Sequence, residues 1–306
     1  MFFARVCLLL FSSLLASYQA SAQVAGQVDR GDVAIHYQVF GEGFPVALLS
    51  GGPGASSSAL LPIARKLDDE YRVVLIDQRG TGLSRLAVLD STTITLANYV
   101  EDVDAVRRRL GIDRWLLVGH SWGGGLAMAV TAAHPGHSAG MVLIGSIGID
   151  LEYLDYAFDN LKYSESDLAA MKFWSDPEHR AVNPERAAYE YYRALLPSRV
   201  YQPDDMLLIL ENLVVEKDFS TIAPLMPEDL KRVGYDLRPA LKAYEGPVLI
   251  LQGRQGFLGG RTAEKILETL PNAEIAFIER SGHFSLVEQP EAFFATLTGF
   301  LETHFR

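Results

Sequence analysis

Residues 114–126 read Arg-Trp-Leu-Leu-Val-Gly-His-Ser-Trp-Gly-Gly-Gly-Leu. An apolar run typical of a buried strand ends in the pattern Gly-x-Ser-x-Gly, and small residues typical of a packed helix follow it as far as Pro135. Gly119 and Gly123 allow a strand-to-helix turn in which larger side chains would clash. Such a turn exposes the serine hydroxyl and aims the amide groups of the helix N-terminus at developing negative charge. The stretch therefore predicts a nucleophile elbow with Ser121 as the nucleophile.

Short apolar runs alternate with helical patterns on both sides of this stretch. We expect buried strands at 46–49, 73–76, 115–118, 141–144, 247–251 and 274–278. An alternating run over 33–40 is expected to be an outer strand. Helices are expected over 58–67, 96–110 and 126–133. Strands that alternate with helices predict an α/β fold with a mostly parallel central sheet and helices on both faces.

The alternation stops between about residues 150 and 243. This segment has helical patterns, many aromatic residues and no convincing buried strand. It predicts a helical cap over 150–243, inserted into a core made of 23–149 and 244–306. An aromatic-rich cap favours an apolar substrate.

The first 22 residues differ from the rest of the chain. A basic start and a short apolar stretch lead to Ala20-Ser21-Ala22, which is typical of a signal-peptide cleavage site. A membrane anchor is the alternative, but the apolar stretch is short for spanning a bilayer. The sequence thus predicts a signal peptide over 1–22 and a secreted or periplasmic protein. Cys7, the only cysteine, lies inside this peptide, so the mature chain would contain no thiol.

Composition narrows the partners. The chain has 306 residues, of which 49% are hydrophobic, and a formal net charge of −11. That charge argues against binding nucleic acid through phosphate neutralisation. No metal-ligand spacing is visible, and no cofactor is expected. After signal cleavage we expect no membrane segment, and a small molecule or a short peptide as the substrate.

A serine hydroxyl needs a base to become a nucleophile. His283 is the best candidate, because it follows the last expected strand at the sheet edge where ligands bind in open α/β sheets. His120 precedes the serine directly and is expected to point away from it. Two backbone amides must also stabilise the oxyanion. We expect one from Trp122 and the other from Gly51 or Gly52, which follow the strand at 46–49.

These motifs together resemble the α/β-hydrolase superfamily, and within it the proline iminopeptidase-like group of serine hydrolases. The resemblance rests on four stretches: Gly-Gly-Pro-Gly at 51–54, Asp-Gln-Arg-Gly-Thr-Gly-Leu-Ser at 77–84, Gly-His-Ser-Trp-Gly-Gly at 119–124 and Gly-His at 282–283. It implies the α/β-hydrolase fold, a nucleophile at Ser121, a base at His283 and a helical cap over the insertion.

The chain departs from that group at three places. Ser50 precedes Gly-Gly-Pro-Gly where members usually carry histidine. The cap glutamates that bind the free amine in aminopeptidase members have no clear match in the stretch 189–192, Tyr-Glu-Tyr-Tyr. Most seriously, Gly256 stands where members carry the aspartate of the catalytic triad. Loss of that acid lowers turnover by about 10⁴ in triads from which it has been removed.

Asp150 is the nearest carboxylate after the preceding strand, a place where some superfamily members carry the acid. It is predicted as a substitute acid, although a role as a capping residue at the entry to the cap is favoured over this one. Asp77 is a third carboxylate near the sheet edge and is expected to organise its own loop together with Arg79.

The sequence therefore predicts a secreted serine hydrolase that cleaves a small amide or ester through an acyl-enzyme. A proline iminopeptidase-like aminopeptidase is the first specific hypothesis. An esterase or lactonase acting on small apolar acyl groups is the second. A degenerate hydrolase that binds a small molecule without efficient turnover is the alternative from another class, and the missing acid is its motivation.

Overall fold

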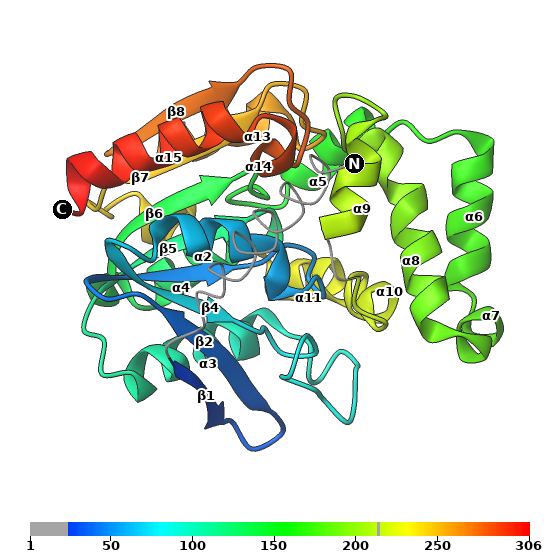
Figure 1. Cartoon of the computed structure of the whole chain (residues 1–306), viewed down its shortest axis with the longest axis horizontal. Helices are drawn as coiled ribbons and strands as arrows, with labels where there is room; N and C mark the ends of the chain where they lie inside the picture. Colours follow the sequence, from blue (N-terminus) through cyan, green and yellow to red (C-terminus); the bar gives the residue numbers. More distant parts are fainter. Residues whose placement is uncertain (1–23, 213–214) are drawn as a thin grey trace, which may run out of the picture.

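The computed structural model describes residues 24–212 and 215–306 (Figure 1). The signal peptide predicted over 1–22 lies outside the described residues. Within the described part, eight strands form one sheet in the order β1-β2-β4-β3-β5-β6-β7-β8. The strands are β1 (Val24–Asp29), β2 (Ala34–Phe40), β3 (Phe44–Leu49), β4 (Tyr71–Ile76), β5 (Trp115–His120), β6 (Ser138–Ile144), β7 (Val248–Gly253) and β8 (Ala273–Ile278).

The pairing of the strands confirms the predicted fold class. Strands β3 to β8 are parallel to one another, while β2 is antiparallel to both of its neighbours, β1 and β4. The strand predicted at 33–40 is confirmed as β2, but it is not the outermost one, because β1 pairs along it and forms the edge. Strand β1 was missed because its residues are mostly exposed and give no apolar run.

Helices cover both faces of the sheet, as predicted. The two faces arise because neighbouring strand residues point in opposite directions. The core helices are η1 (Ser57–Leu60), α2 (Leu61–Leu67), α3 (Leu96–Arg109), α4 (Trp122–Ala133), η2 (Pro135–His137), α13 (Gly259–Thr269), α14 (Ser285–Glu288) and α15 (Pro290–His304). Leu117 belongs to the hydrophobic cluster on the face covered by α3 and α4, whereas Leu116 belongs to the hydrophobic cluster on the face covered by α2 and α15.

The segment between β6 and β7 is helical in its described residues. It contains α5 (Tyr153–Asn160), α6 (Glu165–Ser175), α7 (Pro177–Val182), α8 (Pro184–Leu195), η3 (Leu196–Ser198), α9 (Asp205–Asn212), α10 (Phe219–Ile222), α11 (Leu225–Val233) and α12 (Arg238–Leu241). Its first and last helices pack on the core, α5 against α13 and α12 against α4. Helices α6, α7 and α8 project away from the sheet at the right of Figure 1. The insertion is therefore joined to the core at both ends and free on one side.

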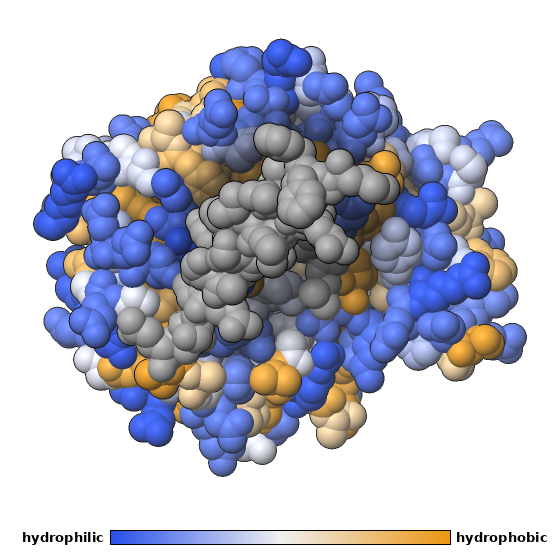
Figure 2. Space-filling view, in the orientation of Figure 1, coloured by the Kyte–Doolittle hydropathy of each residue, from blue (hydrophilic) through white to orange (hydrophobic). Residues whose placement is uncertain are grey.

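The surface is mostly polar. Figure 2 shows a largely hydrophilic face outside the grey residues, with scattered hydrophobic residues. Isolated exposed hydrophobic residues are ordinary on a folded protein. Among the described helices, none is both long and apolar enough to cross a bilayer.

Parallel strands bring their carboxyl ends to one edge of the sheet. The loops that leave β3, β5, β6 and β8 there carry Ser50, Ser121, Gly145 and His283 respectively. Helix α9 of the insertion contacts α14, which follows directly after His283. The fold thus places the insertion over the edge that carries the candidate residues.

Candidate active site

Ser121 occupies a strained turn between β5 and α4. Its backbone has φ 57° and ψ −118°, a region that residues other than glycine rarely adopt. The turn is tight because a Cβ atom at Gly119 would collide with the carbonyl group of Gly123, and one at Gly123 with the carbonyl group of Leu49. The local geometry is therefore that of the predicted elbow, with Ser121 at its tip.

His283 lies in the loop after β8, and two groups hold this loop in place. Its backbone N–H donates to the carbonyl oxygen of Arg199 in the insertion, at 2.7 Å. The buried carboxylate of Glu288 accepts hydrogen bonds from the amides of Gly282 at 2.9 Å and Phe284 at 3.0 Å. Sequence reasoning missed Glu288, because its role depends on the turn that brings it back to the amides of this loop.

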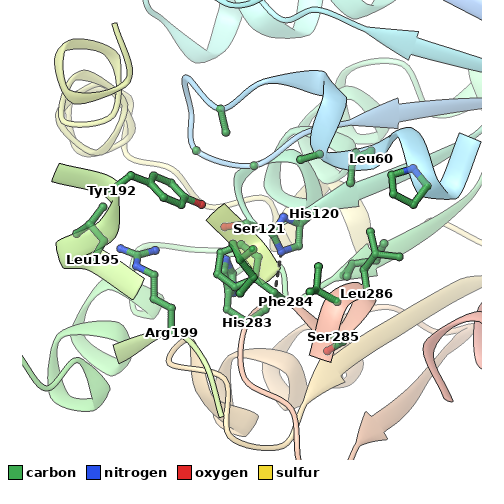
Figure 3. A pocket seen from close by; sticks show the side chains of 18 of the residues that line it. Leu60, His120, Ser121, Tyr192, Leu195, Arg199, His283, Phe284, Ser285 and Leu286 are labelled. Atoms are coloured by element: carbon green, nitrogen blue, oxygen red, sulfur yellow. Dashed lines mark hydrogen bonds between the residues drawn. The ribbon is translucent and has the colours of Figure 1, made fainter. Parts of the chain in front are cut away.

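Ser121 and His283 line the same cavity, of about 270 Å³ (Figure 3). Gly51 and Gly52 line its core side, and Tyr191, Tyr192 and Arg199 come from the insertion. No hydrogen bond joins the two side chains within the described part of the chain. Such bonds are often long in free enzymes and tighten when substrate binds.

The sequence analysis expected His120 to point away from the site, and this expectation is wrong. Its ring lines the cavity, and its centroid lies 4.7 Å from that of His283. Its Nε2 lies 3.0 Å from the carbonyl oxygen of His283. A carbonyl only accepts hydrogen bonds, so this contact requires the proton on Nε2. His120 therefore supports the loop that carries His283.

The expected oxyanion donors lie on two neighbouring loops. Within the described residues, the amides of Gly51, Gly52 and Trp122 donate to no acceptor, so they are available to a ligand. The buried side chain of Gln78 joins the two loops: its Nε2 donates to the carbonyl oxygen of Ser50 at 2.8 Å, and its Oε1 accepts from Trp122 Nε1 at 2.9 Å. Gln78 is a positioning residue that the sequence analysis did not single out.

Ser50 supports the loop where relatives of this type carry histidine. Its hydroxyl donates to the carbonyl oxygen of Ala55 at 3.1 Å and lies 3.1 Å from Gln78 Nε2. Asp77 organises its loop by accepting a hydrogen bond from the amide of Leu83 at 2.9 Å. Its expected partner Arg79 instead pairs with Asp102, at 2.6 Å from Nε to Oδ2.

The structure does not place Asp150 beside His283. Its Oδ2 lies 2.5 Å from Lys265 Nζ and 3.2 Å from Arg238 Nε. Its backbone forms an isolated antiparallel bridge with Asp236, which joins the start of the insertion to its end. As a substitute acid Asp150 is therefore a wrong prediction, because two cations engage its carboxylate. The alternative of a residue at the entry to the cap fits better, since Oδ1 accepts from the amide of Glu152 at 3.1 Å.

The Nδ1 atom of His283 is buried and has no hydrogen-bond partner among the described residues. It faces Gly145, the first residue after β6, where a Cβ atom would lie 3.3 Å from Nδ1. A Cβ atom at Gly256 would instead lie nearest to the Gln252 side chain and to the carbonyl oxygens of Gly253 and Gly282. Gly145 is thus a residue without a side chain directly against Nδ1, and Gly256 leaves no acid at the place where the resemblance implies one.

Burial lowers the pKa of His283 well below the usual value of an imidazole. Repulsion from His120 and from the guanidinium of Arg199 lowers this pKa further. Burial also lowers the pKa of His120. His283 is therefore neutral at pH 7 and able to accept a proton. The described residues contain no cluster of three or more His, Cys, Asp or Glu that could hold a metal ion.

Replacing Asp150 tests its assignment as a structural residue. Asp150→Asn should lower the stability of the fold by about 2 kcal/mol, because it removes the buried charge that Lys265 and Arg238 share and leaves Lys265 with Glu152 alone. The effect is smaller than for a fully buried pair, since the side chain of Arg238 is 44% exposed. Thermal unfolding measures this loss of stability. Asp236→Asn is the control and should cost less, because the side chain of Asp236 is 35% exposed. A native melting curve combined with lost turnover would return Asp150 to the role of acid.

Comparison with known proteins gives the family. The family model of the α/β hydrolase fold matches residues 45–290. The proline iminopeptidase of Neisseria meningitidis is 44% identical over 108 residues, which are 34% of this chain and 33% of that protein. The proline iminopeptidase of Arabidopsis thaliana is 37% identical over 122 residues, or 39% and 30% of the two chains. The matched segments span about a third of these relatives.

Solved structures share the fold. A proline iminopeptidase-related protein from Thermus thermophilus has a TM-score of 0.70 at 23% identity, with 92% of this chain and 98% of that chain covered. A thermophilic esterase from Thermogutta terrifontis has a TM-score of 0.70 at 20% identity, with 92% and 100% covered. Because the family model covers well over half of its length, the chain belongs to the α/β-hydrolase family and is similar to proline iminopeptidases.

Proposed function

We propose that the protein is a serine hydrolase that cleaves small esters or amides through an acyl-enzyme at Ser121. The observation that carries this proposal is the cavity that Ser121, His283 and Gly51 line together. The strained backbone of Ser121 holds its hydroxyl at the N-terminus of α4. The amides of Gly51 and Trp122 nearby donate to no acceptor among the described residues. A nucleophile, a neutral base and oxyanion donors thus meet in one small volume.

The reaction follows from these positions. Ser121 Oγ attacks the carbonyl carbon and passes its proton to His283, while the amides of Trp122 and Gly51 stabilise the oxyanion. The bond to the leaving group then breaks, and the leaving group takes the proton from His283. A water molecule attacks the acyl-enzyme with His283 again as the base. The acid product leaves, and Ser121 regains its proton.

The chemistry of the cavity favours an ester over a substrate with a free amine. No Asp or Glu is among the described residues that line the cavity, so nothing there would pair with an ammonium group. Glu190, the glutamate in the stretch 189–192, pairs with Arg193 at 2.8 Å instead. An aminopeptidase is the second candidate, and the similarity to proline iminopeptidases supports it. Hydrolysis of p-nitrophenyl acetate against proline p-nitroanilide separates the two.

The reactivity of Ser121 tests the proposal most directly. The purified mature chain should react with a fluorophosphonate probe, because the elbow and the neutral imidazole activate the hydroxyl. The matched Ser121→Ala variant should remain folded, lose labelling and lose hydrolysis of p-nitrophenyl acetate. Absence of labelling in the parent would favour the degenerate hydrolase that only binds a small molecule. Residual hydrolysis in Ser121→Ala within about tenfold of the parent would reject Ser121 as the nucleophile.

The pH dependence of turnover tests His283 as the base. Only the neutral imidazole accepts the proton, and its pKa lies below the usual value of about 6.5. The value of kcat/KM should therefore be at its plateau at pH 7 and fall only as the pH drops through this lowered pKa. His283→Ala should abolish turnover across the range. A midpoint at or above about 6.5, with chemistry limiting the rate, would contradict the assignment.

Supplying an acid tests whether the triad lacks one. Gly145→Asp should raise kcat by at least about tenfold, because its carboxylate would accept from Nδ1 of His283 and stabilise the imidazolium. Gly145 has φ 45°, a left-handed conformation that Asp and Asn tolerate best among residues with side chains. Gly145→Asn fills the same space without the charge and is the control. Equal kcat values for these two folded variants would show that no charge is missing.

A further inference from the structure

The guanidinium of Arg199 is an unpaired cation in the wall of the cavity. Arg199 follows η3 of the insertion and lines the cavity with Ser121 and His283. Its Nε is buried, and its guanidinium forms no hydrogen bond or ion pair within the described residues. The two buried arginines of the described chain are paired, Arg79 with Asp102 and Arg107 with Asp104 at 2.7 Å. The absence of a partner is therefore a property of this position.

Arg199 is held firmly beside the candidate base. Its carbonyl oxygen accepts from the backbone N–H of His283 at 2.7 Å. Two residues later, the amide of Tyr201 donates to Glu288 Oε1 at 2.6 Å. The guanidinium carbon lies 4.5 Å from the centre of the Phe257 ring, which stabilises a cation but leaves its N–H donors free. The site is thus built from both the insertion and the core.

The side chain enters the cavity from the insertion. Figure 3 shows Arg199 beside Leu195 and Tyr192, across from Ser121 and His283, with the hydroxyl of Tyr192 pointing into the cavity. No carboxylate lines this cavity in the described part of the chain. The sequence has no Asp or Glu at 1–23 or 213–214 either. Within the described residues, the cavity thus leaves the guanidinium of Arg199 available to a negatively charged ligand.

We propose that Arg199 binds a carboxylate of the substrate, so that the enzyme prefers small esters or amides that carry a carboxylate away from the scissile bond. A guanidinium offers two parallel N–H donors that match a carboxylate. One cation in a small, mostly apolar cavity balances a single negative charge, which favours a carboxylate over a phosphate monoester with nearly two. The same cation repels a substrate ammonium group.

A bound carboxylate also assists the candidate base. Arg199 and His120 both oppose a positive charge on His283, and no acid contacts its Nδ1 within the described residues. A substrate carboxylate that pairs with Arg199 offsets this repulsion when His283 takes the proton of Ser121. The preference for such substrates should therefore be visible in kcat as well as in KM.

Three methyl esters of six-carbon acids measure the preference, compared at initial rates per ester bond: monomethyl adipate, dimethyl adipate and methyl 6-aminohexanoate. Their distal groups are a carboxylate, a neutral ester and an ammonium, and released methanol reports hydrolysis. The value of kcat/KM should be highest for monomethyl adipate and lowest for the amine. Arg199→Gln should lower kcat/KM for monomethyl adipate at least about tenfold relative to its value for dimethyl adipate, so that the preference between the two esters is lost. Arg199→Lys should restore part of the loss.

Arg254→Gln is the matched control. Its guanidinium lies 3.9 Å from the centre of the Phe277 ring but pairs with Glu279 and does not line the cavity. This variant should keep the parental preference. If Arg199→Gln does not fold, the proposal is tested on the parent enzyme alone. Equal kcat/KM values for monomethyl and dimethyl adipate would then overturn it.

The preference in hydrolysis rests on the proposed function, but the carboxylate site itself does not. A binding experiment therefore tests the site separately from the hydrolase activity. Titration calorimetry of the inactive Ser121→Ala variant should detect monomethyl adipate, and the added substitution Arg199→Gln should weaken this binding at least about tenfold. Binding that depends on Arg199 in a protein without esterase activity would reject the hydrolase and keep the carboxylate site. Hydrolysis of both adipate esters that is indifferent to Arg199→Gln would keep the hydrolase and reject the site.

Discussion

The turn at Ser121 is the constraint on which the rest of the site depends. A side chain at Gly119 would collide with the backbone of α4, and one at Gly123 with the backbone at the end of β3; within this close packing Ser121 has a positive φ. Such strain amounts to about 1–3 kcal/mol and persists only when the surrounding structure imposes it. Here the sheet on one side and the helices packed on both faces impose it. As a consequence, the hydroxyl of Ser121 is held in a fixed position at the N-terminus of α4.

Buried polar side chains attach the neighbouring loops to this turn. Gln78 ties the loop after β3 to Trp122, and Glu288 ties the loop after β8 to the insertion. Each of these side chains makes hydrogen bonds to groups of two different segments. A buried amide or carboxylate without such partners would be unfavourable, so these bonds stabilise one arrangement of the loops. The active-site geometry is thus specified by residues that need not contact a substrate.

The electrostatics of the cavity differ from those of a catalytic triad with its acid in place. An imidazole flanked by an acid is stabilised in its charged form, whereas His283 faces glycine at Nδ1 and has cationic or neutral neighbours. The one charged side chain that lines the cavity in the described residues, Arg199, is unpaired. The nearest acid in the sequence after β6, Asp150, is engaged by Lys265 and Arg238. Negative charge is absent where the proposed reaction would benefit from it.

The sequence by itself determined the α/β fold, most of the strands and the loops that carry Ser121 and His283. These features depend on local rules: apolar runs, helical periodicity and glycines where a turn requires them. Strand β1 was not predicted, because an exposed edge strand has no apolar run in its sequence. Only the tertiary structure decided the partners of Asp150, the orientation of His120, the bare Nδ1 of His283 and the position of Arg199. Charges and hydrogen bonds between residues far apart in the chain depend on distances in space, and no spacing in the sequence records them.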